Sequence, residues 1–428
     1  MADARSLQQA ITEGGIESVN FFNGRLLTGQ DLSREQAARR KIEQRIGLGL
    51  GTGIVFGLDV RRAPADAKDP TLPGVSIGAG LAINAAGDVL QLAAPETVRL
   101  SPVALPGPTG PLGFGDCDEA DEAKFGTYLA GEGLYLLTLA PASVATGRAA
   151  SNGLGGTAVA CNTDVDIAAV QFRLLEIRPQ LYADLDPAAP DFRNRIAYRC
   201  FGNGVLADWG NALLAGGARS DDLLVAMAGY GLSPHDLPLA LVGFSGASDF
   251  DLLDVDAVQR PLARPDGGGA GSFLASLAAP RRVATGHAMV QQFARHLADL
   301  TGPTGALGTV TARGSFPFLP PVGVLPYADG AAAKRFFAGM AVRGPVHINA
   351  EQVETLVAES FTTPAIRSRD DNLIWLYAVA GNRLSQRLPL GDPERTNPYI
   401  VFASGHLAYR ADARFNLARF DVANVALG

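Results

Sequence analysis

The apolar positions near the start of the chain predict a helix whose apolar stripe is incomplete. Thr28 and Asp31 match a capping box, in which the hydroxyl accepts an unpaired backbone N–H and the acid lies at the positive end of the helix dipole. The helix predicted over residues 29–46 carries three apolar residues on the same face as two charged ones: Leu32, Ile42 and Ile46 beside Glu35 and Arg39. A core helix would continue the i, i+3, i+4 pattern of apolar residues. The helix's own domain can therefore bury only part of its apolar surface, which indicates that a partner covers the rest.

Alternating apolar and polar residues predict an antiparallel β-domain after this helix. Residues 53–60 have the period of two expected of one strand, with the apolar side chains on one face. Residues 75–83 and 89–92 show the same period on either side of the turn residues 84–88, which predicts a hairpin. A stretch rich in Pro and Gly then marks a domain boundary near residue 105.

The rest of the chain mixes both patterns, and a Gly-rich stretch at 265–272 marks a second boundary. The expected fold class is α+β and β-rich: an N-terminal helix plus an antiparallel, sandwich-like β-domain, followed by mixed β/helical domains. The expected domains are residues 1–105, 106–264 and 273–428. The later strands are predicted at 133–142, 165–179, 237–262, 371–381 and 398–410, and the later helices at 193–214, 220–231, 286–302 and 349–361.

The composition describes a globular chain with no broad electrostatic signal. Of the 428 residues, 47% are hydrophobic and 18% are charged, so the chain can bury substantial cores. The net charge of −7 provides no basic field, and we therefore expect no nucleic-acid binding. One local basic run lies on the predicted helix beside Glu35 and Glu43, and we interpret it as a solvated or salt-bridged face. The run contains Arg39, Arg40, Lys41 and Arg45.

The sequence predicts cytoplasmic synthesis. The first residues lack the basic and apolar regions of a secretory signal, and no run of about 18 apolar residues is present to span a membrane. Three cysteines without a CxxC spacing suit neither a disulfide framework nor a zinc site. Any action at the cell envelope would then require release by a route other than a signal peptide.

No motif predicts catalysis, and we expect neither an enzyme nor a bound cofactor or metal. The glycines of residues 47–53 match neither GxGxxG nor a P-loop, and they follow a helix instead of preceding one. His287 and His296 lie nine residues apart on one predicted helix, which places them about 180° apart and prevents them from sharing a metal. The acidic clusters at 116–122 and 249–256 lack the EF-hand order. We interpret the second cluster as a solvated sheet face, and a cation site remains the alternative.

The string FLPPVGVLPY, residues 318–327, has two interpretations. Its prolines lack N–H donors and hold the chain extended, while its aromatic and apolar side chains offer contact surface. It is therefore either a recognition loop or a rigid strap that closes a domain. The candidate residues are Phe318, Leu319, Pro320, Pro321 and Tyr327.

The first hundred residues resemble one family of bacterial and phage proteins. The resemblance rests on FFNGRLLTGQDL, then GIVFGLDV, then GLAINAAGD, in that order. This family is similar to the structural components of phage tails and phage-tail-like contractile injection systems, at baseplate, fibre or accessory positions. The matching residues are Phe22, Gly24, Leu26, Leu27, Thr28, Asp31, Glu35, Gln36, Gly53, Gly57, Leu58, Val60, Gly80 and Ala82.

The resemblance implies a structural or adaptor protein that works by protein–protein assembly. It implies other subunits of a tail-like particle as partners, and a homo-oligomer of three-fold or six-fold symmetry. A surface- or carbohydrate-binding module of a fibre-like protein is the alternative function. The candidate docking residues, all in the N-terminal segment, are Phe21, Phe22, Leu26, Leu27, Leu32 and Ile42.

Overall fold

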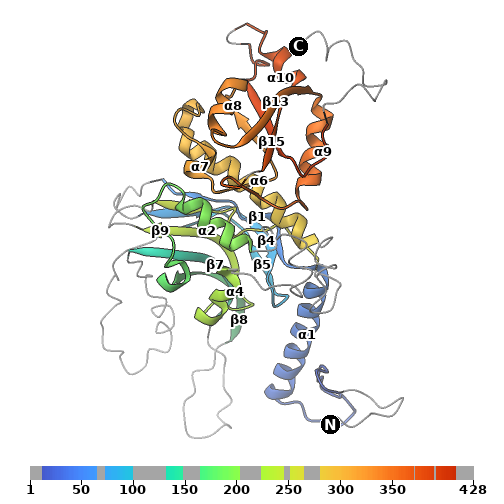
Figure 1. The fold of residues 1–428 in the computed structure, drawn as a ribbon. Coiled ribbons are helices and arrows are strands. Elements are labelled where there is room, and N and C mark those ends of the chain that lie inside the picture. The colour runs from blue at the N-terminus through green and yellow to red at the C-terminus, as the bar shows by residue number, and fades with distance from the viewer. Residues whose placement is uncertain are drawn as a thin grey trace, which may run out of the picture.

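The computed structural model has an α+β fold, as predicted (Figure 1). An N-terminal helix is followed by antiparallel sheets and then by a mixed sheet with helices. In Figure 1 this helix extends from one end of the molecule, and the C-terminal mixed sheet lies at the other end. The structure describes residues 12–64, 73–99, 132–147, 164–202, 223–244, 251–264, 280–370, 372–389 and 392–410.

The first helix, α1 (Gly29–Leu50), begins where the sequence predicts. The Thr28 hydroxyl accepts the Asp31 N–H at 3.2 Å, and the Asp31 carboxylate accepts the Thr28 N–H at 3.1 Å. This confirms the capping box. The helix continues past the predicted end at residue 46, because Gly47 lets its last turn pack closely against the turn that contains Gly87.

Two small antiparallel sheets follow α1. The turn predicted at residues 84–88 is confirmed, and residues 80–83 pair with residues 89–92 across it. The single strand predicted before that turn, over residues 75–83, is wrong, because residues 78–79 separate two short strands that join different sheets. The single strand predicted over residues 53–60 is wrong, because Leu58 has a φ of 58° and separates two short strands that join different sheets. Phe56, expected on the buried face, is exposed. One sheet contains β1 (Gly53–Gly57), β4 (Gly80–Ile83) and β5 (Val89–Leu92), and the other contains β2 (Val60–Arg62), β3 (Gly74–Ile77) and β6 (Glu96–Arg99).

The central sheet is antiparallel throughout and has the order β10-β9-β7-β8. One hydrophobic core joins it to the small sheets, with Val60 and Ile77 packed in the same cluster as Leu137 and Leu239. The boundary predicted near residue 105 lies outside the described residues, and the segments on both sides of it share this core. The strands are β7 (Gly133–Thr146), β8 (Val165–Ile177), β9 (Leu237–Phe244) and β10 (Leu252–Asp254), where the sequence predicts strands.

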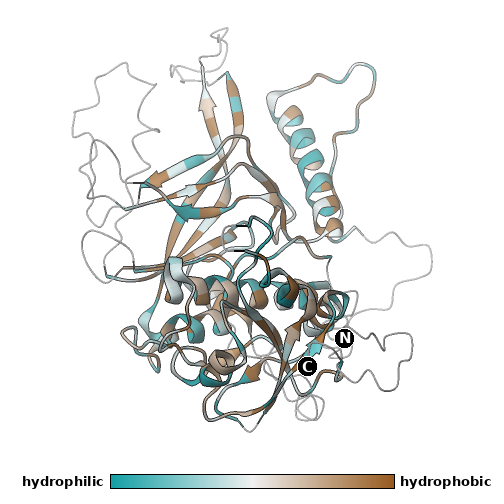
Figure 2. Cartoon of the chain, turned by 90° about the horizontal axis from the view of Figure 1, so that it is seen from above, coloured by the Kyte–Doolittle hydropathy of each residue, from teal (hydrophilic) through white to brown (hydrophobic). Residues whose placement is uncertain are grey.

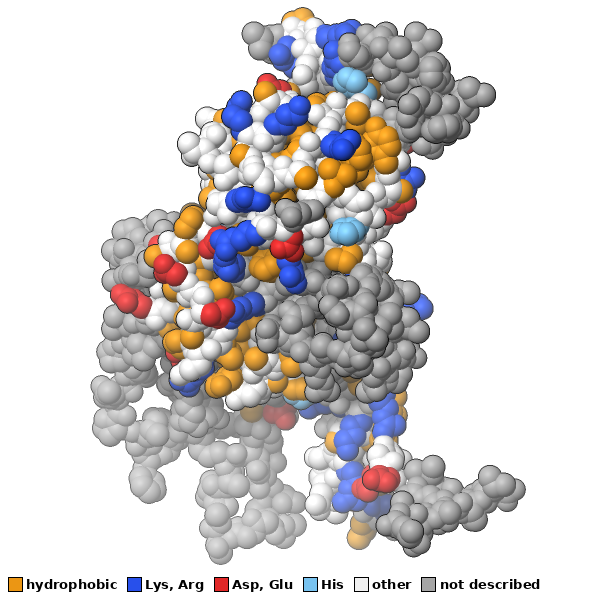
Figure 3. Space-filling model, in the orientation of Figure 1, with side chains coloured by type: hydrophobic (Ala, Val, Ile, Leu, Met, Phe, Trp, Pro, Cys, Tyr) orange, Lys and Arg blue, Asp and Glu red, His pale blue; other side chains and the backbone are white. Residues whose placement is uncertain are grey.

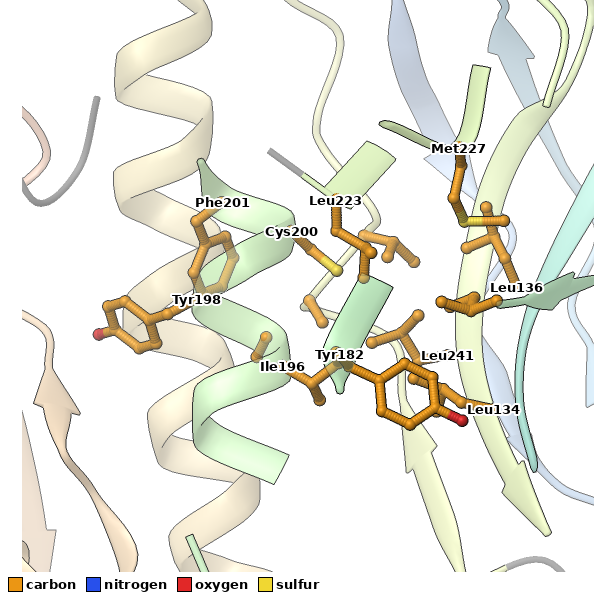
Figure 4. Packing of buried hydrophobic residues seen from close by; sticks show 14 of the residues in the cluster. Leu134, Leu136, Tyr182, Ile196, Tyr198, Cys200, Phe201, Leu223, Met227 and Leu241 are labelled. Carbon is orange, nitrogen blue, oxygen red and sulfur yellow. The ribbon is translucent and has the colours of Figure 1, made fainter. Parts of the chain in front are cut away.

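Helices cover the other face of the central sheet (Figure 4). Ile196 and Cys200 of one helix pack toward Leu136 and Leu241 of the strands. Met227 belongs to the same cluster. The second predicted boundary, at 265–272, lies outside the described residues. The elements are η2 (Pro179–Tyr182), α2 (Phe192–Phe201), α4 (Leu223–Met227), η4 (Ala228–Tyr230) and α6 (Pro280–Thr301), which begins before the predicted residue 286.

The C-terminal body is a mixed sheet of order β12-β16-β15-β13, in which β13 and β15 are parallel. Helix α6 belongs to two cores, because Met289 packs with α2 whereas Phe293 and Leu297 pack in the C-terminal aromatic core. The strands are β11 (Phe318–Leu319), β12 (Val322–Pro326), β13 (Ala341–Ile348), β14 (Ile366–Arg367), β15 (Leu373–Val379) and β16 (Tyr399–Ser404). The helices are η5 (Gly302–Thr304), α7 (Ala312–Ser315), α8 (Gly330–Phe336), α9 (Ala350–Ser360) and α10 (Ala380–Ser385).

Candidate functional site

The N-terminal arm, residues 12–28, folds back along α1. The Val19 N–H donates to the Glu35 Oε2 at 3.1 Å, and the Arg45 guanidinium donates to the Gly14 carbonyl. Val19 and Ala38 are buried between the two segments. The arm therefore covers one side of the helix and leaves another side open.

A turn and a salt bridge connect the arm to the start of α1. The Arg25 N–H donates to the Phe22 carbonyl at 3.2 Å and closes a turn at Gly24, whose φ is 90°. The Arg25 guanidinium also lies 2.6 Å from the Asp31 carboxylate. A hydrogen bond from the Thr28 hydroxyl holds the pKa of Asp31 below its usual value, and Arg25 adds to the effect. The charged carboxylate thus stabilises the cap.

All six candidate docking residues are exposed. The exposed fraction is 89% for Leu26 and 63% for Phe22, whereas an ordinary core residue would be buried. In the arm, Phe21 and Phe22 precede a turn and do not form a strand. The set of exposed candidate residues is Phe21, Phe22, Leu26, Leu27, Leu32 and Ile42.

The open side of α1 carries an apolar stripe longer than the one predicted. Leu32, Ile42, Ile46 and Leu50 are each at least half exposed. At about 100° per residue, they lie within an arc of about 80° on the helix surface. The sequence analysis missed Leu50, because the helix was expected to end at residue 46.

Helix α1 stands clear of the sheets apart from its last turns (Figure 2). A Cβ built on Gly47 would stand 2.1 Å from the Gly87 carbonyl oxygen, so the two backbones are in contact. The Gln44 amide donates to Asp88 Oδ1 at 2.7 Å, and the His235 ring lies 2.7 Å from Asp88 Oδ2. Burial alone would raise the pKa of Asp88. The hydrogen bonds that Asp88 accepts from Gln44, Asn84 and His235 outweigh this effect, so the pKa is lowered. The helix is thus anchored at one end only.

The basic run on α1 is solvated, as interpreted from the sequence. Its side chains are exposed, and Arg39 lies 4.0 Å from the Glu43 carboxylate one turn later. Lys and Arg side chains are prominent on the face of α1 seen in Figure 3. Five basic residues on the helix outnumber its three acidic residues, in contrast to the acidic chain as a whole.

The glycines of residues 47–53 allow close packing. The Gly51 carbon lies against the Ala263 carbonyl, and Gly53 lies against Pro261. The backbones of Thr52 and Ala263 exchange two hydrogen bonds of 3.0 Å. These contacts join the end of α1 to the segment that follows the central sheet.

The segment at residues 318–327 is mostly interior. Phe318 stacks on Tyr198 of α2 with ring centroids 5.1 Å apart, and Asn194 bonds both the N–H and the carbonyl of Phe318. Leu319, Pro320 and Pro321 are buried. This burial favours the strap over the recognition loop. Tyr327 alone among the five candidates is exposed.

Two residues of the acidic cluster at 249–256, Asp254 and Asp256, do not lie on the solvated sheet face that the sequence suggested, whereas Asp251 is exposed and Asp249 lies outside the described residues. Asp254 is fully buried and accepts hydrogen bonds from Arg193 and Gln292, at 2.7 and 2.9 Å. Asp256 is also buried, and burial raises its pKa to about 6 although Arg295 lowers it. The other cluster, at 116–122, lies outside the described residues.

His287 and His296 both lie on α6, and their rings contact different aromatic residues, Phe361 and Phe316. His296 packs against Phe316 with ring centroids 4.8 Å apart, and burial lowers its pKa to about 3. Among the described residues, no three His, Cys, Asp or Glu side chains are grouped so that they could hold a metal ion.

No family model and no curated protein matches the chain. None of the helices in the described ranges combines the length and the apolar character needed to cross a bilayer.

Proposed function

We propose that the chain is a structural or adaptor subunit of a phage-tail-like contractile injection system, at a baseplate, fibre or accessory position. The observation that carries this proposal is the exposure of apolar side chains on the arm and on α1. Helix α1 is anchored to the rest of the chain at one end only. Exposed apolar side chains gathered on one segment favour an interaction site, because their exposure to water costs free energy. The sequence resemblance supplies the class of particle.

The docking surface is defined here as Phe21, Phe22, Leu26, Leu27, Leu32, Ile42, Ile46 and Leu50. Its occupant is a neighbouring subunit of the particle with an apolar groove and an acidic rim. The apolar groove covers the stripe, and the acidic rim complements the basic excess of α1. Copies of the chain then repeat around the particle axis with three-fold or six-fold symmetry. Subunits are made in the cytoplasm and reach the cell envelope only within the particle.

The test is incorporation into purified sheath-and-tube particles. The double variant Leu32→Glu, Ile46→Glu is expected to fold with an unchanged melting temperature, because both side chains are more than half exposed, and to be absent from the particles. Ala37→Glu adds one negative charge on the opposite side of α1, where the exposed alanine is not part of the stripe, and serves as the control for added charge.

Normal incorporation of the double variant would refute docking through α1. Loss of incorporation in the Ala37→Glu control as well would show that added charge alone prevents assembly, and would equally remove the support for the stripe.

A further inference from the structure

Two adjoining hollows lie where α6 faces the strands, away from the docking surface. The polar hollow has a volume of about 730 Å³ and lies between β2, β10 and α6. The apolar hollow has a volume of about 600 Å³, with Tyr182, Phe192 and Phe244 in its wall. Arg193, Asp251 and Asp299 border both hollows. One ligand can therefore contact a polar and an apolar wall at once.

Arg193 lies between the hollows and bonds two carboxylates. Its Nε donates to Asp254 at 2.7 Å, and its Nη1 donates to Asp299 at 2.6 Å. Its Nη2 is buried and has no hydrogen-bond partner among the described residues. A buried guanidinium N–H without an acceptor is costly, so this atom is suited to a ligand oxygen.

Two further buried groups at these hollows have unused hydrogen-bonding atoms. Asp256 Oδ2 lies 3.1 Å from Arg295 Nε, but that approach does not have hydrogen-bond geometry, so we count the contact as an ion pair only. His296, only 3% exposed and bordering the apolar hollow, has no partner for Nδ1 within the described part of the chain. The walls therefore offer both a donor, from Arg193, and an acceptor, from Asp256.

The charges around the polar hollow balance. Four arginines and four aspartates border it: Arg61, Arg62, Arg193, Arg295 and Asp59, Asp251, Asp256, Asp299. The aspartates would repel a phosphate, and the arginines would repel a cation. Hydroxyl groups both donate and accept hydrogen bonds and carry no charge, so they match this lining best.

We propose that the paired hollows bind a neutral sugar. Its hydroxyl groups bond Arg193 and Asp256, and its less polar face lies against Tyr182 and Phe192 in the apolar hollow, as concave sites with a few placed polar groups bind ligands. This gives a specific site to the carbohydrate-binding role that the sequence analysis left open. The site shares no residue with the docking surface.

The experiment measures sugar binding to the full-length chain by saturation-transfer NMR. The probes are glucose, galactose, mannose and N-acetylglucosamine, with cellobiose, lactose and chitobiose as disaccharides, each at millimolar concentration. Inorganic phosphate is the anionic comparison. We expect at least one sugar to bind and phosphate not to compete with it.

Three variants locate the binding. Gln291→Trp places a large ring in the polar hollow from an exposed position on α6, and is expected to abolish binding. Val283→Trp, at an exposed position of the same helix that borders neither hollow, is the control and keeps it. Asp256→Asn, which retains the shape of the side chain, is expected to weaken binding about tenfold, because a hydrogen bond to a charged carboxylate is replaced by a weaker one to a neutral amide oxygen.

The proposal is overturned if none of the sugars binds, which would mean that the hollows hold water only. It is also overturned if sugar binding survives Gln291→Trp, or if phosphate binds there and the sugars do not. Because binding is measured on the free chain, its failure leaves particle docking through α1 untouched, and failure of docking leaves the sugar site untouched.

Discussion

Gly47 of α1 and Gly87 of the β4–β5 turn are in direct backbone contact, which leaves no room for a side chain on Gly47. Gly87 has a φ of 88°, a conformation that also favours glycine. The adjacent hydrogen bond from Gln44 to Asp88 adds a polar contact to the same joint. This joint determines where α1 leaves the body, and therefore where the docking surface is presented.

Substitution of Gly47 is expected to loosen this joint. Gly47→Ala places a Cβ 2.1 Å from the Gly87 carbonyl oxygen, so the helix must shift, at a cost of roughly 1–3 kcal/mol in the free energy of unfolding. Gly49→Ala is the matched control, because nothing lies within 4 Å of a Cβ at that position. The control is expected to gain about 1 kcal/mol from helix propensity. Urea denaturation measures both, and equal stabilisation of the two variants would show that the contact does not exist in solution.

Asn194 is expected to be essential for holding the strap to α2. Its side chain is fully buried and bonds both backbone groups of Phe318, at 2.9 and 3.0 Å. Asn194→Ala leaves these groups without partners, which costs about 1–3 kcal/mol for each buried group. Asn194→Asp keeps the acceptor for the Phe318 N–H. When mild acid neutralises the new carboxylate, this variant is expected to lose less stability than Asn194→Ala. Thermal melting of the two variants at pH 4 and 7 separates the contributions, and unchanged melting of both would contradict this role.

Burial of His296 predicts a specific pH dependence of stability. Its pKa falls from 6.5 to about 3 in the folded chain, so the unfolded chain binds a proton first as the pH falls. The stability associated with the neutral ring is present above pH 6.5 and is lost as the pH approaches 3. Arg193 lowers this pKa further, whereas Asp299 raises it.

His296→Gln removes this titration. Relative to the variant, the wild-type chain is expected to lose up to about 1.4 kcal/mol per pH unit between pH 6 and 4. Asp256 acts in the opposite direction, because burial raises its pKa to about 6 and its neutral form favours the fold below that pH. Urea denaturation at several pH values measures the difference, with the exposed His406→Gln as control. A difference that is constant with pH would refute the burial of a neutral His296.

Local sequence signals predicted the elements whose cause is local. The capping box of Thr28 and Asp31 needs only four consecutive residues, and the hairpin turn at 84–88 is equally short. The helix predicted over 286–302 ends as expected because Gly302 and Pro303 cannot continue it. The break at Leu58 was missed, since a positive φ is rare for leucine and the alternation of apolar residues continues through it.

Features that depend on distant contacts were not predictable from the sequence. Asp254 and Asp256 alternate as they would on a solvated sheet face, but arginines more than 35 residues away in sequence enclose them. The parallel pairing of β13 with β15 likewise requires a connection through α9 that no local pattern reports. The exposure of Leu32 and Ile42 was predictable, because an incomplete apolar stripe is visible in the sequence itself. The joint at Gly47 was not, because it needs the position of Gly87.

Truncation separates the docking segment from its anchor. The hydrogen bonds of Val19, Arg25 and Thr28 described above stay within the arm and α1, so removing residues 1–43 is expected to leave the melting temperature of the rest almost unchanged. Removing residues 1–50 also deletes the contacts of Gln44 and Gly47 with the β4–β5 turn, and is expected to lower it. Both truncated chains should be missing from particles, because both lack Leu32 and Ile42. Differential scanning calorimetry measures the melting temperature, and particle sedimentation measures incorporation. If removal of residues 1–43 unfolded the β-sheets, the arm would be part of the core.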